Sequence, residues 1–290
     1  MTRHDGAWLL PRIFDHRPDA SKLLALQDFT LEQLWWNTPL IVAQALLLSE
    51  IVRTYPAELS MIRRIIKRKK PNLAEMMFFS IKYVSLISVV LTTLVQLTKV
   101  PGTDARCVAF SWASNIFTFS ICTLVVMTIA WRTSIIFHGQ RKVQYLLGAG
   151  LALQICLSGW AVAVYFKLTR VTPTGLCVEE ARLVKHQGFY QLSTFWYVLW
   201  NALFDLAMVT SSSVRLWRSA RGPTGFARIS ALLFANNIHY AIGADLVNII
   251  ELVTVIGFRY SVPSYQFLVI TIQAMLGMQL LISEQEAVYN

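Results

Sequence analysis

The sequence predicts an all-α, polytopic membrane protein built as a bundle of seven transmembrane helices. Of its 290 residues 55% are hydrophobic and only 14% are charged, whereas a soluble domain carries about 25% charged residues. One crossing of the hydrocarbon core needs about 20 apolar residues, and the chain contains six such windows and a shorter seventh. Polar residues inside the later windows recur at helical spacing, which indicates that these helices pack against one another.

Seven spans are expected between two short terminal segments. Residues 1–33 mix acidic and basic side chains and lack the apolar core of a signal peptide, so we expect an extracellular tail. Pro56 is expected to end the first span, and Gly148 and Gly150 in the fourth would let neighbouring backbones approach. The expected spans are 34–55, 73–97, 107–131, 143–166, 192–214, 229–258 and 262–283, and a cytoplasmic tail, 284–290, follows.

Charge sets the expected orientation. The connections after odd-numbered spans and the C-terminal tail together carry fourteen basic residues (Lys and Arg) and four acidic ones (Asp and Glu). The segments on the other side of the membrane carry eleven basic and eight acidic residues. Because Lys and Arg favour cytoplasmic loops, we expect the N-terminus outside and the C-terminus inside. Most of the formal charge of +10 then sits in short loops at membrane boundaries, which argues against nucleic-acid binding.

A basic segment follows the first span. In the stretch MIRRIIKRKK, within 57–70, apolar and basic residues alternate in pairs, a pattern typical of a short amphipathic helix on a membrane surface. Its charges either attract anionic lipids at the cytoplasmic face or only fix the orientation. The six bases are Arg63, Arg64, Lys67, Arg68, Lys69 and Lys70.

Polar residues on the last three spans form the candidate site. Hydrocarbon offers no hydrogen-bond partners, so such residues mark either a functional site or contacts between helices. We expect a structural seam near the cytoplasmic side and a ligand-facing group nearer the outside. The seam consists of Asn201, Asp205 and Asn237, with Asp205 opposite Asn237. The ligand-facing group consists of Asp245, Asn248, Glu251 and Gln273.

Two further pairs of residues are expected to meet. Glu50 and Lys82 lie about 8 and 14 Å from the cytoplasmic ends of their helices. A lysine stem can close that gap by snorkelling, which predicts a buried ion pair. Cys107 and Cys177 both fall on the oxidising outer side, and they either form a disulfide or remain two thiols. The other two cysteines lie within spans, and no Cys or His spacing suggests a metal site.

Five stretches carry a recognisable pattern: SEIVRTYPAEL (49–59), FFSIKYVSLI (78–87), WRTSIIFHGQRKVQYLL (131–147), LFDLAMVTSSSVRLWR (203–218) and NNIHYAIGADLVNII (236–250). In this order they resemble a family of basidiomycete-type fungal integral membrane proteins that open with a domain of unknown function. The resemblance covers most of the chain after residue 34 and implies a seven-helix protein with its N-terminus outside. It implies no activity. Lys82 stands where that family usually has Arg, and 134–136 replace its usual Tyr-Ala-Leu.

Three classes of function remain open. A receptor-like protein that binds or senses a ligand fits the helix count and the basic cytoplasmic loops, and it would have a cytoplasmic signalling partner. A small-molecule or proton-coupled transporter is the runner-up, although no repeated halves or broken helices are visible. A structural membrane protein without a ligand is the third. We expect no enzyme and no cofactor, because motifs such as HExxH and GxSxG are missing, and a location in the plasma membrane or secretory pathway.

Overall fold

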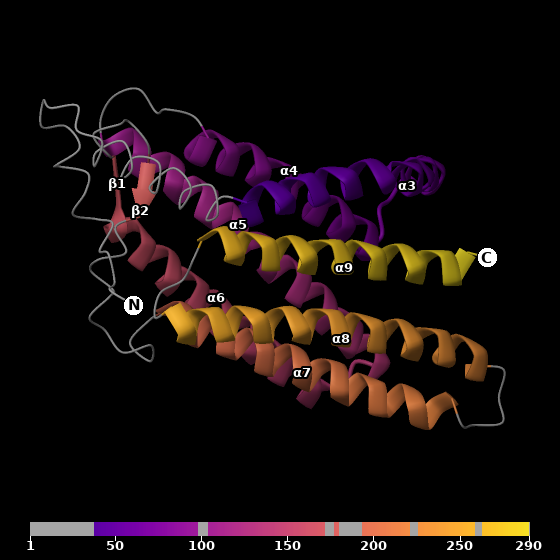
Figure 1. Cartoon of the computed structure of the whole chain (residues 1–290). Helices are drawn as coiled ribbons and strands as arrows, with labels where there is room; N and C mark the ends of the chain where they lie inside the picture. The colour runs from indigo at the N-terminus through magenta and orange to yellow at the C-terminus, as the bar shows by residue number, and fades with distance from the viewer. Residues whose placement is uncertain are drawn as a thin grey trace, which may run out of the picture.

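The protein is a bundle of long helices that lie side by side (Figure 1). The computed structural model describes residues 38–97, 104–171, 177–179, 193–220, 226–258 and 263–289. The first described helix is Thr38–Arg53. The elements that follow are α3 (Tyr55–Arg68), α4 (Leu73–Leu97), α5 (Asp104–Ile136), α6 (Arg141–Leu168), β1 (Thr169–Val171), β2 (Cys177–Glu179), α7 (Ser193–Ala220), α8 (Phe226–Phe258) and α9 (Pro263–Tyr289).

Helices α5 and α9 lie at the centre of the bundle. α5 packs against α4, α6, α7 and α9, and α9 also packs against α4 and α8. α6 packs against α7, and α7 packs along α8. One end of the bundle, here called the basic end, carries α3 and the C-terminus, whereas the other, the hairpin end, carries β1 and β2 (Figure 1).

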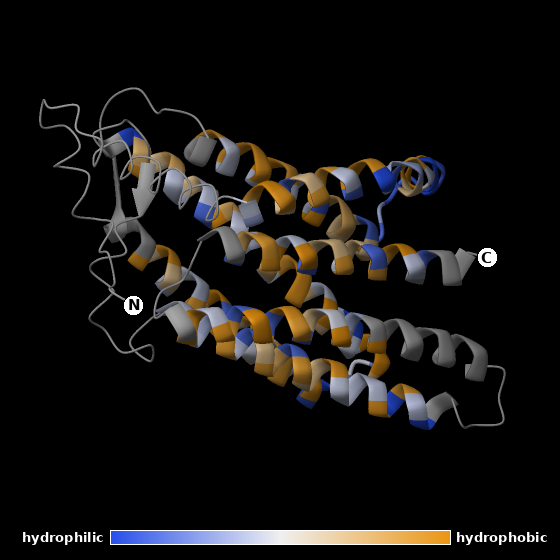
Figure 2. Cartoon of the chain, viewed as in Figure 1, coloured by the Kyte–Doolittle hydropathy of each residue, from blue (hydrophilic) through white to orange (hydrophobic). Residues whose placement is uncertain are grey.

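Burial in this bundle is the reverse of that in a soluble protein. Along α8 the apolar side chains of Ile242, Ile249 and Val253 are 63%, 55% and 62% exposed, whereas Asn248 on another face is fully buried. Exposed apolar groups suit contact with lipid chains, and buried polar groups must then find partners inside the protein. Figure 2 shows apolar residues along all of the long helices, with hydrophilic segments on α3 and at intervals on other helices such as α7.

Four helices in the described part of the chain are long and apolar enough to cross a membrane, namely those within α4, α5, α6 and α9. The bent pair formed by Thr38–Arg53 and α3 makes a fifth. α4 has the bounds predicted for the second span, whereas α9 continues to Tyr289, so most of the expected 284–290 tail is helical. The expected tail 1–33 lies outside the described residues. These findings support an all-helical membrane architecture, and the count of seven crossings and the orientation stay predictions.

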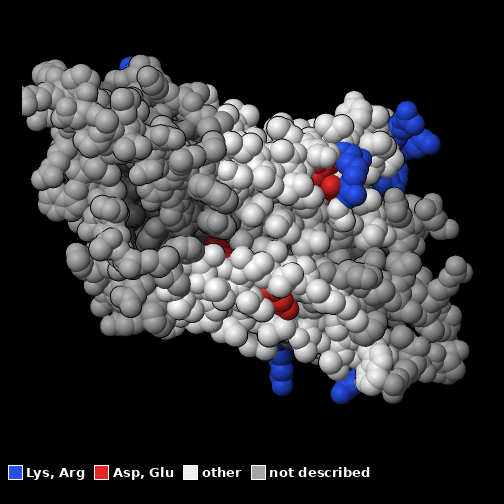
Figure 3. All heavy atoms as spheres, in the orientation of Figure 1, with Lys and Arg blue, Asp and Glu red and all other residues white. Residues whose placement is uncertain are grey.

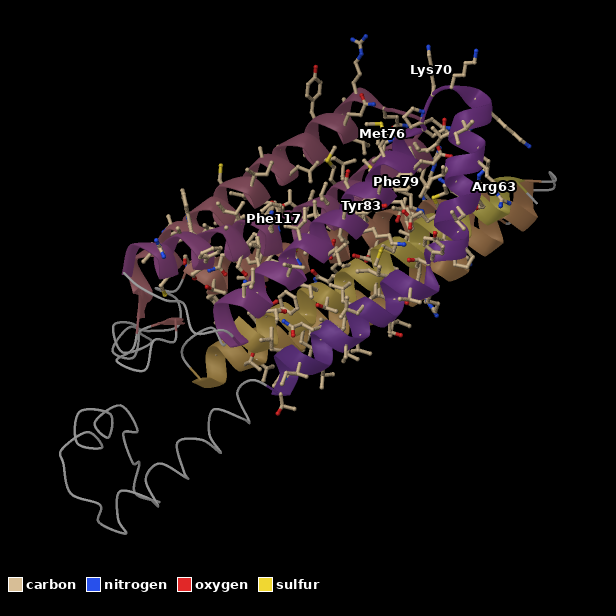
Figure 4. All side chains as sticks on the ribbon, turned by 90° about the horizontal axis from the view of Figure 1, so that it is seen from above. Arg63, Lys70, Met76, Phe79, Tyr83 and Phe117 are labelled. Atoms are coloured by element: carbon tan, nitrogen blue, oxygen red, sulfur yellow. The ribbon has the colours of Figure 1, made fainter. Side chains whose placement is uncertain are left out.

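The first helix ends at Arg53, as expected just before Pro56, and after a break at Thr54 the chain continues as α3 at an angle of 46°. Proline has no N–H, so the carbonyl of residue 52 loses its helical partner. The Thr54 hydroxyl donates to the carbonyls of Glu50 and Ile51 at 2.9 and 3.2 Å, an arrangement that also bends helices. The chain therefore continues as α3, in the place predicted for an amphipathic helix, and crosses the beginning of α4 (Figure 4).

A two-stranded hairpin lies in the connection predicted as a polar loop. β1 and β2 pair antiparallel, with Val171 opposite Cys177, and both strands contact α5. Cys122 and Cys156 are free thiols, whereas Cys107 is buried and is not free. Because the side chain of Cys177 lies outside the described side chains, the Cys107–Cys177 bridge stays a prediction.

A glycine brings α6 and α7 into close contact. The Trp200 indole donates to the Gly150 carbonyl at 3.3 Å and stacks on the Phe204 ring, with centroids 5.6 Å apart. A Cβ at Gly150 would overlap that ring, whereas a Cβ at Gly148 would meet no atom within 4 Å. Only one of these two glycines is therefore required by packing.

We expect Gly150→Ala to lower the free energy of unfolding by about 1–3 kcal/mol, because the Phe204 ring must move out of its stacked position. Gly148→Ala is the matched control on the same helix, and we expect it to change stability by less than about 0.5 kcal/mol. Both values are measured by unfolding in detergent. Equal effects of the two substitutions would contradict the close contact between α6 and α7.

Candidate functional site

Four buried amide side chains from four helices form one hydrogen-bonded chain, which we call the core network. Asn201 on α7 donates to the Asn248 carbonyl oxygen on α8 at 3.1 Å. Gln273 on α9 donates to the same oxygen at 2.7 Å, and Gln154 on α6 donates to the Asn201 oxygen at 3.1 Å. No member is more than 3% exposed, so these amides satisfy one another where water and lipid cannot.

The thiol of Cys122 connects α5 to the core network. Its sulfur lies 3.4 Å from the side-chain oxygens of both Asn201 and Gln273. A thiol has one hydrogen, so it donates to one of these oxygens at a time. All five helices from α5 to α9 therefore meet at a single polar layer.

Two buried carboxylates flank the core network on opposite sides. Asp205 lies one helical turn from Asn201 toward the basic end, and Glu251 lies about one turn from Asn248 toward the hairpin end. Asp205 is 1% and Glu251 5% exposed. Among the described residues, Oε1 of Glu251 and the hydroxyl of Tyr240 have no hydrogen-bond partner. The Asn248 side chain interacts with the Asp205 carboxylate, and the Tyr197 hydroxyl interacts with the Cys122 thiol, although neither contact has the geometry of a full hydrogen bond.

This arrangement leaves hydrogen-bonding capacity inside the bundle. A buried carboxylate without a partner is costly in free energy, and it becomes stable when it takes up a proton, a cation or a polar ligand. Among the described residues, no group of three His, Cys, Asp or Glu side chains is placed to hold a metal ion. The amides and carboxylates of the site can donate and accept hydrogen bonds.

The structure joins the two groups that the sequence analysis keeps apart. Asn248 and Gln273, expected to face a ligand, bond directly or through a shared oxygen to Asn201, which was expected in the seam. Asp245 is half-buried, and the side chain of Asn237 lies outside the described side chains. Whether Asp245, Asn248, Glu251 and Gln273 contact a ligand stays a prediction.

We expected Asp205 on α7 to lie opposite Asn237 on α8, and this prediction is wrong. The Asn201–Asn248 bond fixes the antiparallel alignment of α7 and α8, which brings Asp205 level with Ala244 and Asn237 level with Ser212. The error arises because α7 extends to Ala220, beyond the predicted end at residue 214, while α8 begins only three residues early. Helical angles predict which residues share a face, but depth depends on where each helix ends.

A second polar cluster attaches α3 to α4. The Lys82 ammonium donates to the Glu58 carboxylate at 2.6 Å, and the Tyr83 hydroxyl donates to its other oxygen at 2.6 Å. Burial by itself would raise the pKa of Glu58, but the hydrogen bonds from Lys82 and Tyr83 and the Lys82 charge hold that pKa below its ordinary value. Arg68 forms a further ion pair with Glu75.

The predicted ion pair between Glu50 and Lys82 is wrong, because Lys82 pairs with Glu58. Glu50 instead bonds Arg53, with N···O distances of 2.9 and 3.0 Å, and accepts from Gln279 at 3.3 Å. The bend at Thr54 is the physical reason, because it carries Glu58 over the beginning of α4 while Glu50 stays against α9. Sequence reasoning missed Glu58 because it placed this residue in the amphipathic segment 57–70 and assigned it no partner.

Gln154 and Cys122 were also missed as members of the core network. Gln154 is the only polar amide in the apolar run of α6 after residue 147, and that isolation in a span was the available signal. Cys122 carries no such signal, because a cysteine inside a span usually behaves as a small apolar residue.

Comparison with known proteins gives one informative relative. The chain is 39% identical over 300 aligned residues to virulence factor PIT1 of Mycosarcoma maydis, and the alignment covers 100% of this chain and 69% of that protein. No family model matches the chain.

We expect Asn248→Ala to lower the free energy of unfolding by about 1–3 kcal/mol, because it removes the acceptor of both Asn201 and Gln273 and leaves buried donors unpaired. Ile249→Ala, next along α8 but 55% exposed, is the control and should cost less. Unfolding in detergent provides the measurement. An Asn248 effect no larger than that of Ile249 would contradict the central role of the core network.

We expect Lys82→Met to be strongly destabilising, by about 3–5 kcal/mol, because it leaves the Glu58 carboxylate buried without its ion-pair partner. Adding Glu58→Gln should recover part of that loss, whereas adding Glu50→Gln should not. The two double-mutant cycles are compared by the free energy of unfolding in detergent. Coupling of Lys82 to Glu50 instead of Glu58 would overturn the assignment.

Proposed function

Because the chain belongs to the family of virulence factor PIT1, we propose that it is a fungal membrane protein with a receptor-like role in virulence, in which a small polar ligand binds within the helix bundle. The relative's name supports a contribution to virulence. The described helices support a bundle embedded in a membrane, and the membrane that we propose is that of the cell surface or the secretory pathway.

The proposed topology has seven crossings, with the N-terminus outside and the basic end in the cytoplasm. The distribution of Lys and Arg along the sequence supports this orientation, and on the face visible in Figure 3 the described basic residues gather mainly over α3. A cytoplasmic signalling partner would then bind at the basic end. A protease that cleaves the 63–70 segment from outside intact cells would overturn the orientation.

The two buried carboxylates beside the core network are the observation that carries the proposed binding role. Glu251 Oε1 has no hydrogen-bond partner among the described residues, and the Asp205 carboxylate has only the weak contact with the Asn248 side chain. A ligand with an ammonium or hydroxyl group would satisfy the two carboxylates near the centre of the bundle. Polar residues at this depth are more often functional than residues at the surface.

Proton-coupled transport is the second candidate, and the carboxylates themselves favour it. Asp205 and Glu251 lie on opposite sides of the core network along the bundle axis, which is the arrangement a proton relay would need. The two functions differ in access, because a receptor admits its ligand from one side of the membrane, whereas a transporter opens to both in turn.

Reactivity of the Cys122 thiol distinguishes these functions. The full chain carrying Cys156→Ser is reconstituted in proteoliposomes of known orientation. A small, charged methanethiosulfonate reagent is added from one side or the other. The cysteines that it modifies are identified by mass spectrometry. We expect Cys122 to react only from the N-terminal side, because the proposed ligand enters there. Reaction from both sides would favour transport. No reaction from either side would mean that the core network only holds the helices together.

A further inference from the structure

A second site lies away from the core network, where the bent first helix, α3 and α9 enclose a cleft of about 660 Å³ at the basic end. Arg64 spans the side of this cleft by donating to Gln285 on α9 at 2.8 Å. Its lining consists of Arg53, Thr54, Pro56, Ala57, Ser60, Gln279, Ile282 and Ser283. The cleft exists because of the bend at Thr54, which turns α3 away from the line of the first helix.

Arg53 is the charged group at this cleft, and it is held in place. Its side chain is 63% exposed, and its Nε and Nη2 atoms bond the buried Glu50 carboxylate. Gln279 donates to that carboxylate as well, so the guanidinium is fixed in one orientation. The Nη1 hydrogens take no part in this ion pair and remain available to an anion.

The Ser60 hydroxyl of the lining offers an acceptor to a ligand. It donates to the Ala57 carbonyl at 2.7 Å and accepts from the Arg64 guanidinium at 3.5 Å. An oxygen with two lone pairs then keeps one of them. The cleft therefore combines an anion-binding guanidinium with an acceptor for a hydroxyl or ammonium group.

The outward face of α3 indicates where such a ligand comes from. Tyr55, Leu59, Ile62 and Ile66 are 56%, 37%, 37% and 70% exposed, and at 100° per residue they form one stripe. Helical angles put Arg63 and Lys67 between this stripe and Ser60 at the cleft. A helix with an exposed apolar stripe beside basic residues inserts at the boundary of headgroups and acyl chains.

The charges around the cleft favour an anionic ligand even though Glu50 neutralises Arg53. Between residues 50 and 82 the chain has eight Lys and Arg and three Glu, a net of five positive charges. Two of the three acids are held in ion pairs with Arg68 and Lys82, and the third with Arg53. The remaining bases include Arg63 and Lys70, which are labelled along α3 and the following turn in Figure 4.

From these observations we propose that the cleft binds the headgroup of an anionic phospholipid. The phosphate lies against Arg53, and the hydroxyl or ammonium group of the headgroup lies against Ser60. The acyl chains extend along the apolar stripe of α3. This site is independent of the core network and of the ligand proposed to bind there, so either proposal can fail without the other.

The test uses the purified full chain in detergent and follows its thermal unfolding midpoint during titration with dioctanoyl phosphatidylserine. We expect a saturable rise in the midpoint, and no comparable rise with dioctanoyl phosphatidylcholine. Arg53→Gln should raise the half-saturating concentration about tenfold, because one charge-assisted hydrogen-bonding group is lost. Lys70→Gln, which removes the same charge at the far end of α3, should change it less than about twofold.

A second pair of variants keeps every charge, since Arg53→Gln also leaves Glu50 without its ion pair. Ser60→Phe fills the cleft and should weaken phosphatidylserine binding about tenfold, whereas Ile249→Phe, at a 55% exposed position of α8 outside the cleft lining, should not. Equal effects of Arg53→Gln and Lys70→Gln, or unchanged binding in Ser60→Phe, would overturn the proposal in favour of diffuse surface charge. Equal binding of soluble glycerophosphoserine would show that the ligand is a free phosphate ester and not a membrane lipid.

Discussion

The lack of hydrogen-bond partners in hydrocarbon is the constraint on which this bundle depends. Amides on α6, α7, α8 and α9 meet it by bonding one another, and the α5 thiol joins them. Each bond fixes two helices at one depth and one rotation. Apolar packing does not achieve this alone, because a lipid chain is as apolar as a leucine side chain and competes for the same surface. The core network therefore decides how α5 to α9 are aligned.

The same constraint explains how α3 is attached. A helix at a membrane boundary has lipid on one side, so its apolar residues gain by facing outward and its charged residues must be paired inward. Glu58 and Arg68 face the bundle and form ion pairs, whereas Leu59 and Ile66 are exposed. Part of the apolar face of the helix is exposed, as an amphipathic helix on a membrane surface requires.

Much of the fold follows from the sequence, whereas most of the site does not. The bounds of α4 follow from a run of apolar residues ended by polar ones, and the shared faces of α7 and α8 follow from helical angles. The Asn201–Asn248 register could not be predicted, because it depends on how far each helix continues beyond its apolar run. The Glu58–Lys82 pair could not be predicted either, because it requires knowing the angle between the first helix and α3 after the break at Thr54.

The two proposed sites select opposite chemistries, and the reason lies in their residue types. Amides can satisfy one another because each has donors and acceptors, but a carboxylate has only acceptors when ionised, so Asp205 and Glu251 call for a donor from outside the core network. At the basic end Arg53 has only donors and calls for an acceptor. A positively charged or hydroxylated ligand therefore fits the centre of the bundle, and an anionic headgroup fits the cleft. A single ligand cannot satisfy both sites. The cleft is therefore suited to setting the position of α3 in the membrane, whereas the site beside the core network binds a different molecule.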